Sequence, residues 1–213
     1  MNNCRVCGEG LAEPKRGRKP QYCGTRCRVA AHRERARVAG YIDHLATPVT
    51  LESTYDAVPA ELRSLDRWLR HDNKRPMAVG GWWASSTDPV CWSSFSDAVR
   101  SAYGDGIGFV LNGDGIVCID LDHVIVDGVV DPLVDSFIDA LGDCYVEYSP
   151  SGQGLHIWGY SDIPGKGKVY VGGAIKVEIY PDKRFITVTG RQYHKGQNSL
   201  GVLNIANALR LVL

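Results

Sequence analysis

Two sequences decide the fold of this chain: IGFVLNGDGIVCIDLDH, residues 107–123, and YVEYSPSGQGLHIW, residues 145–158. Within the first, the run from Ile116 to Asp122 is apolar except at Asp120 and Asp122, which favours a strand. Side chains alternate along a strand, so both carboxylates point to one face, about 7 Å apart. Two such anions repel each other unless cations lie between them, which indicates a metal site. The alternative is that Asp122 merely ends the strand and that Asp120 is solvated on an edge.

The second sequence contains a tight polar loop, Ser149 to Gly154, between two expected strands. Its glycines allow backbone amides to approach a ligand closely. His156 follows directly and shares a strand face with Trp158. The loop and the histidine are therefore candidates for binding an anionic group.

A third acidic side chain comes from the expected strand Ile175 to Tyr180. Alternation places Lys176, Glu178 and Tyr180 on one face, with the apolar residues between them facing the core. Three acids on neighbouring strands, with a glycine-rich loop and a histidine, suggest a site for a metal–triphosphate group.

The order of IDLD, SPSGQGLH, VEIY and KRFITVTG resembles the catalytic core of the archaeo-eukaryotic primase superfamily. It is most similar to the bifunctional primase-polymerase domain of phage and plasmid replication proteins, over roughly residues 59–213. The resemblance implies an RRM-like catalytic sheet. It also implies Mg or Mn as the catalytic metal, and a DNA template and nucleoside triphosphates as partners.

By that resemblance, Asp120 and Asp122 are metal ligands, Glu178 is the third carboxylate and His156 contacts the incoming nucleotide. Two positions depart from the family pattern. Gly154 stands two residues before His156, where the family usually has serine, and the third acid is Glu where Asp is common. The expected triphosphate contacts include the loop residues Ser149, Ser151, Gly152 and Gly154.

Length and composition set broad limits on the class of protein. The chain has 213 residues, 44% of them hydrophobic, which suits a sizeable core with a small appendage. No stretch has the ~20 apolar residues of a membrane span, and the first residues lack the apolar region of a signal peptide. We expect a cytoplasmic protein without a membrane partner, in the host cytoplasm if a phage encodes it.

The formal net charge of zero conceals an asymmetry. Residues 1–40 contain 10 Lys or Arg against 3 acids, a net of +7, and residues 41–213 contain 14 against 21, a net of −7. A basic head on an acidic body suggests that the head binds a polyanion such as nucleic acid. The alternative for the basic loop 14–20 is a merely solvated surface.

Four cysteines form a compact cluster in the head. Cys4, Cys7, Cys23 and Cys27 have the spacing C-x2-C-x15-C-x3-C. In a cytosolic protein this spacing indicates a structural zinc site, because four thiolates satisfy tetrahedral zinc and so short a segment has little core. His32 is the reserve ligand if one cysteine is not used.

These observations predict three segments: a zinc-finger-like basic module over 1–43, a linker over 44–58 and a catalytic domain over 59–213. The class is α+β, with a mixed or antiparallel sheet that carries the site and helices that cover its other face. Expected helices run from Pro59 to Arg70, from Ser94 to Tyr103, over 131–142 and over 200–213. A hairpin is expected around the turn Asn112 to Gly115.

Other basic and aromatic residues are weaker candidates. Lys74 and Arg75 are possible phosphate contacts, and Arg184 is expected at the rim of the site, with a surface ion pair as its alternative. The pair Trp82 and Trp83 fits a core position better than a base-stacking role.

The sequence thus predicts a primase-polymerase nucleotidyltransferase that uses two-metal-ion catalysis. One alternative is a metal-dependent nuclease with the same acids. Another is a non-catalytic replication-origin DNA-binding protein. Related phage proteins often continue into a helicase domain, so either a separate helicase is an expected partner or the chain is a fragment.

Overall fold

The structure is a computed structural model, and it describes residues 2–11, 20–23, 27, 31, 54–164, 167–172 and 175–213. The chain divides into two compact units, Met1–Val49 and Thr50–Leu213. Most of the basic loop 14–20, His32, the arginines after Cys27 and residues 44–53 of the expected linker lie outside the described residues. None of the described helices is long and apolar enough to cross a membrane.

The first unit contains a short antiparallel ribbon of β1 and β2 (Asn2–Asn3 and Gly10–Leu11). Its turn is closed by hydrogen bonds from the Cys4 amide to the Glu9 carbonyl and from the Gly8 amide to the Cys4 carbonyl. Gly8 has a φ of 75°, a conformation in which glycine avoids the strain of a side chain. The ribbon thus holds Cys4 and Cys7 at one tight turn.

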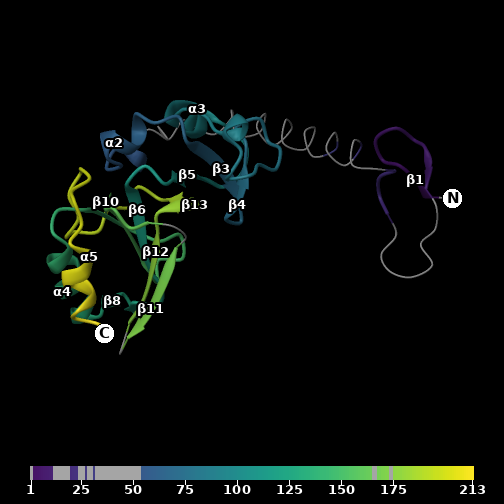
Figure 1. Cartoon of the computed structure of the whole chain (residues 1–213). Helices are drawn as coiled ribbons and strands as arrows, with labels where there is room; N and C mark the ends of the chain where they lie inside the picture. The colour runs from purple at the N-terminus through teal and green to yellow at the C-terminus, as the bar shows by residue number, and fades with distance from the viewer. Residues whose placement is uncertain are drawn as a thin grey trace. The chain divides into compact units, whose positions relative to one another are not determined.

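The second unit is α+β, and its two main sheets are antiparallel, which confirms the predicted class (Figure 1). The larger sheet has the order β11-β12-β6-β10-β9 and the smaller has the order β13-β5-β3-β4. The larger consists of Lys168–Gly172, Ile175–Tyr180, Ile116–Leu121, Leu155–Tyr160 and Tyr145–Tyr148. The smaller consists of Asp182–Val188, Gly106–Asn112, Trp68–Asp72 and Arg75–Met77. The other elements are α2 (Ala60–Arg63), η2 (Pro89–Cys91), α3 (Phe95–Arg100), β7 (Ile125–Val126), β8 (Val129–Val130), α4 (Pro132–Leu141) and α5 (Ile205–Leu209).

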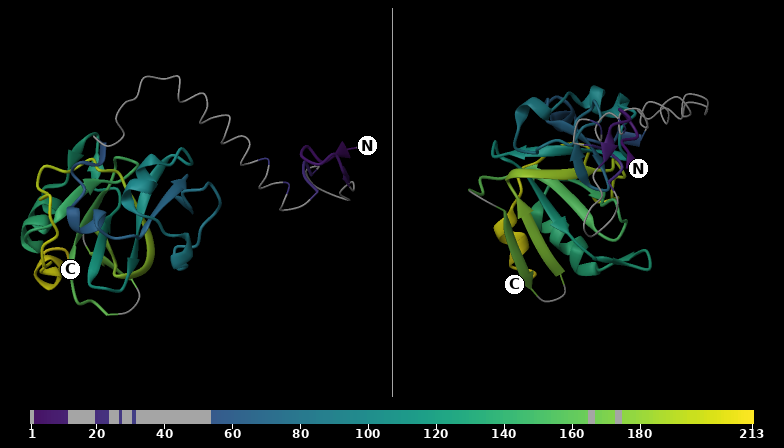
Figure 2. Two further views of the ribbon diagram at one scale, coloured as in Figure 1. Left: turned by 90° about the horizontal axis from the view of Figure 1, so that it is seen from above. Right: turned by 90° about the vertical axis from the view of Figure 1, so that its right-hand side faces the viewer.

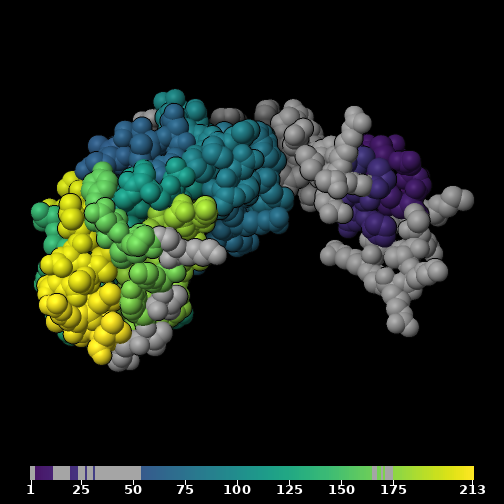
Figure 3. All heavy atoms as spheres, in the orientation of Figure 1, coloured from purple at the N-terminus to yellow at the C-terminus, as the bar shows by residue number. Residues whose placement is uncertain are grey.

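The larger sheet separates two hydrophobic clusters. Val117, Ile119 and Leu121 of β6 pack on one face with the apolar side chains of α4 and α5. Ile116 and Cys118 belong to the cluster on the other face, together with residues of the smaller sheet. Figures 1 and 2 show α4 and α5 side by side on the first face. In Figure 3 the blue and teal residues of the smaller sheet lie against the green and yellow residues of the larger sheet and its helices.

The helix α4 begins and ends as its sequence predicts. Asp131 caps it by accepting a hydrogen bond from the Leu133 amide at 2.8 Å, and Pro132 occupies the first turn. Gly142 follows the last residue with a φ of 90°. Val134, Phe137, Ile138 and Leu141 are buried. The expected helices at 94–103 and 200–213 are present in shortened form as α3 and α5.

The predicted hairpin around Asn112 to Gly115 is wrong. β5 pairs with β3 and β13, whereas β6 pairs with β10 and β12, so the turn carries the chain from one sheet to the other. Within it, Asp114 accepts two hydrogen bonds from the buried Arg67 guanidinium, at 3.2 and 2.7 Å. This ion pair fixes the turn to the smaller sheet and directs β6 away from β5.

The helix expected from Pro59 to Arg70 is also wrong in its second half, because it ends at Arg63 and Trp68 begins β3. Neighbours β5 and β4 lie on both sides of β3, and Trp68 and Leu69 are both fully buried, so the strand shows no polar alternation. The helical spacing of the leucines therefore arises because buried positions of α2 and of β3 follow one another along the chain, and the leucines do not share one helix. β3 and β4 form a hairpin whose turn residues Asn73 and Lys74 both have positive φ.

Trp82 and Trp83 are not core residues, contrary to the prediction. They are 47% and 44% exposed and lie in the loop after β4. The Arg75 guanidinium stacks 4.0 Å from the ring centroid of Trp83, so this side chain is partly covered by a charged group. The aromatic pair therefore contributes to the surface of the smaller sheet.

Candidate active site

The structure brings the three predicted acids together. Asp120 lies in β6, Asp122 follows the end of β6, and Glu178 lies on the neighbouring strand β12. Asp120 and Glu178 are direct cross-strand partners, and oxygen atoms of all three carboxylates lie within 4.8 Å of one another. This is the arrangement that the alternation of β6 and β12 predicts, and its donor set suits a hard divalent cation.

Asp120 is the most constrained of these acids. Burial raises the pKa of Asp120; His156 opposes this shift, and the carboxylates of Asp122 and Glu178 add to it. Its Oδ1 atom is buried and makes no hydrogen bond with the described residues. A buried carboxylate oxygen without a donor is costly, so this atom suits a cation as its partner.

Glu178 has partners of its own. The Lys176 ammonium forms an ion pair with one carboxylate oxygen, and the Tyr180 hydroxyl donates to the other. Lys176, followed by Tyr180, lowers the pKa of Glu178. The third acid is thus held ionised by side chains on the same face of its own strand.

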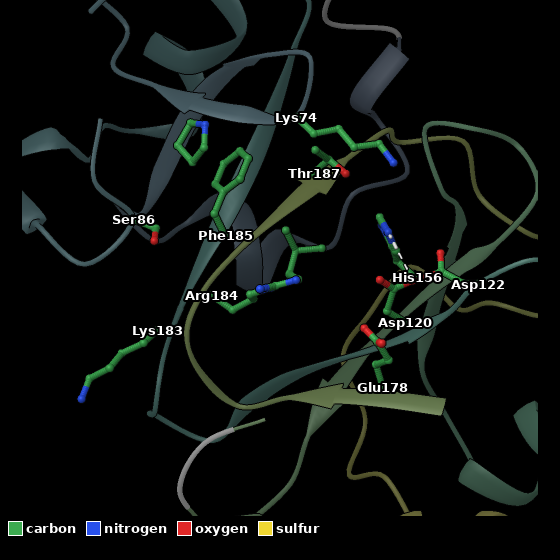
Figure 4. A pocket seen from close by; sticks show the side chains of 12 residues that line it. Lys74, Ser86, Asp120, Asp122, His156, Glu178, Lys183, Arg184, Phe185 and Thr187 are labelled. Carbon is green, nitrogen blue, oxygen red and sulfur yellow. Dashed lines mark ion pairs between the residues drawn. The ribbon is translucent and has the colours of Figure 1, made fainter. Parts of the chain in front are cut away.

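His156 lies in β10, between the acids and a further buried carboxylate. Across the larger sheet the direct cross-strand partners run in the order Glu147, His156, Asp120 and Glu178. Nε2 of His156 is 3.9 Å from Oδ1 of Asp120, as the dashed line in Figure 4 shows. Burial lowers the pKa of His156, but Glu147 and then Asp120 outweigh it, and the net shift is upward. The structure thus places His156 beside Asp120, and its role in the site stays a prediction.

A pocket of about 500 Å³ opens over these acids and is bounded by both sheets. Asp120, Asp122, His156 and Glu178 form one wall. The other side carries Lys74 from the β3–β4 turn and the backbone of Arg184 in β13, and Figure 4 shows the Arg184 side chain extending toward the acids. The guanidinium of Arg184 also stacks 4.5 Å from the ring centroid of Tyr180. An acidic wall that faces a basic wall suits a ligand that combines cations with an anion, such as a metal–polyphosphate.

The loop from Ser149 to Gly154 does not line this pocket among the described residues. Ser149 is buried, its hydroxyl lies 3.1 Å from that of Ser151, and the Gly152 amide donates to the Ser149 carbonyl. A side chain at Gly154 would lie 2.5 Å from the Leu121 carbonyl oxygen, so glycine is required there for close packing against the end of β6. In the structure this loop supports the strand end that carries Asp122.

Sequence reasoning missed Glu147 in β9. Its side chain is completely buried beside His156, and its Oε1 lies 3.5 Å from Nδ1 of His156. The signal was present as a lone acid in the otherwise apolar or aromatic strand YVEY. The pairing of β9 with β10, which places it beside the histidine, is a tertiary feature that the strand sequence does not state.

The four cysteines also come together. Ligand atoms of Cys4, Cys7, Cys23 and Cys27 lie within 4.8 Å of one another, and Cys23 Sγ is 3.5 Å from both Cys7 Sγ and Cys27 Sγ. Hydrogen bonding from the Cys7 backbone lowers the pKa of the Cys4 thiol to about 6. Hydrogen bonds with Cys27 and then Cys7 raise the pKa of Cys23. Four sulfur atoms this close are consistent with the predicted zinc finger.

No family model matches the chain. Over 131 residues it is 34% identical to the DNA primase-polymerase of Nitratiruptor phage NrS-1. The match covers 58% of this chain and 18% of the relative, so it spans less than a fifth of the relative's length. The resemblance inferred from the sequence motifs is therefore confirmed: the chain is a homologue of a phage DNA primase-polymerase.

Proposed function

We propose that the chain is the nucleotidyltransferase part of a primase-polymerase, which makes or extends primers on a DNA template from nucleoside triphosphates. The observation that carries the proposal is the acidic triad of Asp120, Asp122 and Glu178, which faces Lys74 and Arg184 across one pocket. The antiparallel sheet with two helices on one face supports an RRM-like catalytic core. The homology to a phage DNA primase-polymerase supports the same reading.

Asp120, Asp122 and Glu178 would hold two divalent cations, Mg or Mn. The residues fit this role, because Oδ1 of Asp120 is buried without a hydrogen-bond donor among the described residues and the set contains only carboxylate oxygens. When bound, such cations activate the attacking 3′-hydroxyl and neutralise charge on the leaving pyrophosphate.

The other residues would act on the triphosphate itself. His156 presents its ring from the wall of the acids, where it would contact a phosphate oxygen. Arg184 and Lys74 would neutralise the remaining phosphate charge from the opposite side, since both line the pocket. The amides and hydroxyls of Ser149, Ser151, Gly152 and Gly154 would position Asp122 and His156 more than contact the nucleotide, because they bond largely within their own loop.

The four-cysteine cluster would hold a structural zinc, and the basic head over 1–43 would bind the template or the 5′ end of the new primer. Residues 44–58 would link it to the catalytic domain, 59–213. The net charge of +7 over residues 1–40 supports nucleic acid as the partner. Strand separation would be supplied by a helicase, and the protein would act in the cytoplasm of the phage host.

The decisive experiment measures incorporation of labelled nucleoside triphosphates on single-stranded DNA, with Mg or Mn supplied. We expect labelled products that are absent with Asp120→Asn. Degradation of the template without incorporation would identify a nuclease. DNA binding with neither reaction, and without metal-dependent nucleotide binding in calorimetry, would identify a non-catalytic DNA-binding protein.

A further inference from the structure

Glu147 is an anchored carboxylate at the base of the candidate site. It is wholly buried, and its Oε2 accepts hydrogen bonds from the Gly190 amide at 2.8 Å and from the Thr189 amide and Tyr145 hydroxyl at 3.1 Å. The Thr189 hydroxyl lies 3.3 Å from the same oxygen and 2.7 Å from the Tyr148 carbonyl, to which it donates at the shorter distance. Several donors that converge on one oxygen fix both the charge and the orientation of a buried carboxylate.

The other oxygen of Glu147, Oε1, lies beside His156. Oε1 is buried, makes no hydrogen bond with the described residues and lies 3.5 Å from Nδ1 of His156, which is equally buried and without such a bond. A carboxylate oxygen can only accept, so Nδ1 must carry the proton for the two atoms to satisfy each other. Nε2 is then the nitrogen that faces Asp120 and the pocket.

We propose that Glu147 is a positioning residue: its Oε1 holds the Nδ1–H of His156 and thereby turns the Nε2–H of the ring toward a phosphate oxygen of the nucleotide, which can only accept. The phosphate part of this inference rests on the proposed function. Carboxylates behind metal-binding histidines orient the ring in the same physical way, and their loss typically costs 10- to 100-fold in affinity or activity.

The substitution Glu147→Gln separates this role from the anchoring role. The donors at Tyr145, Thr189 and Gly190 require an acceptor, so the glutamine carbonyl replaces Oε2. Its amide NH2 then faces Nδ1 of His156 and donates to it, which removes the proton from Nδ1. The fold keeps its anchor, while the histidine can carry a proton only on Nε2 and no longer donates from both nitrogens.

The test is a two-bond proton–nitrogen NMR spectrum of the metal-free full chain at fixed pH, with the His156 signals assigned from His156→Asn. We expect Nδ1 to be protonated in the wild type and unprotonated in Glu147→Gln. Tyr145→Phe is the matched control, because it removes a donor to Oε2 and leaves Oε1 in place. An unchanged His156 spectrum in Glu147→Gln, or an equal change in Tyr145→Phe, would overturn the proposal.

A second measurement follows binding of a nucleoside triphosphate in the presence of Mg. Glu147→Gln and His156→Asn should each weaken binding roughly ten-fold, and the double variant should be no weaker than either. Affinity for single-stranded DNA should not change. Additive losses would mean that Glu147 acts independently of His156. If Nδ1 loses its proton in Glu147→Gln as expected but neither the wild type nor any variant incorporates nucleotides, the proposed function fails and the positioning role stands.

Discussion

The ammonium of Lys176 forms an ion pair with the carboxylate of Glu178, two residues further along the same strand face. A cation bound by the acidic triad must compete with this ammonium. Lys176→Met should therefore strengthen binding of Mn, by only roughly two- to five-fold, since the pair is partly exposed and such pairs contribute little to stability. Calorimetric titration with Mn measures the change. Lys195→Met is the matched control, because Lys195 pairs with Asp139 on α4; equal gains in both variants would exclude direct competition.

Asp120→Asn should separate stability from activity. Burial and the neighbouring acids disfavour the Asp120 carboxylate, so the variant should unfold at a higher temperature than wild type in a chelator at neutral pH. Incorporation should fall by more than about a hundred-fold, and Mg should no longer raise the melting temperature. Asp114→Asn offers a contrast, because it breaks the pair with buried Arg67 and should lower the melting temperature. Wild-type turnover by Asp120→Asn would refute its role as a ligand.

His71 should make stability depend on pH. Burial lowers the pKa of His71 below its usual 6.5, despite the Asp105 carboxylate 2.6 Å from Nδ1. The unfolded chain then binds more protons than the folded one below about pH 6.5, so the free energy of unfolding should fall as pH decreases through that value. Above it, this contribution is constant. Urea unfolding between pH 5 and pH 8 measures the free energy of unfolding at each pH. This free energy should change less with pH in His71→Asn than in wild type, and an equal change would contradict the assignment.

The head should matter most before a primer exists. Changing Cys23 and Cys27 to serine, or removing residues 1–45, should impair primer synthesis on bare template. Extension of a supplied primer should be spared, because base pairing between primer and template replaces part of the lost contacts with the head. Cys91→Ser, a free cysteine of the second unit, should affect neither reaction. The affinity of the head variants for DNA should also depend less on salt concentration than that of the wild type, because they have lost phosphate contacts that release counterions. Normal priming by the truncated chain would indicate a docking module.

The parts of the site that strand alternation determines could be predicted from the sequence. Asp120 and Glu178 follow from the period of two along their own strands, and the caps of α4 follow from Asp131 and Gly142. The strand β3 could not be predicted, because Trp68 and Leu69 are both buried and the sequence lacks the polar alternation that marks a strand. Neither could the place of Glu147, because it depends on which strand pairs with β10.

The two sheets of the second unit are joined at two crossings, the turn Asn112–Gly115 and the single residue Pro181. The Gly113 amide donates to the Pro181 carbonyl at 3.1 Å, so the crossings are tied to each other. Glu178 precedes the second crossing and Arg184 follows it, on opposite walls of the pocket. For protein engineering, chain length at these crossings is therefore fixed: an added residue there would shift one wall against the other, whereas the exposed turn Asp127–Gly128 would accept an inserted tag.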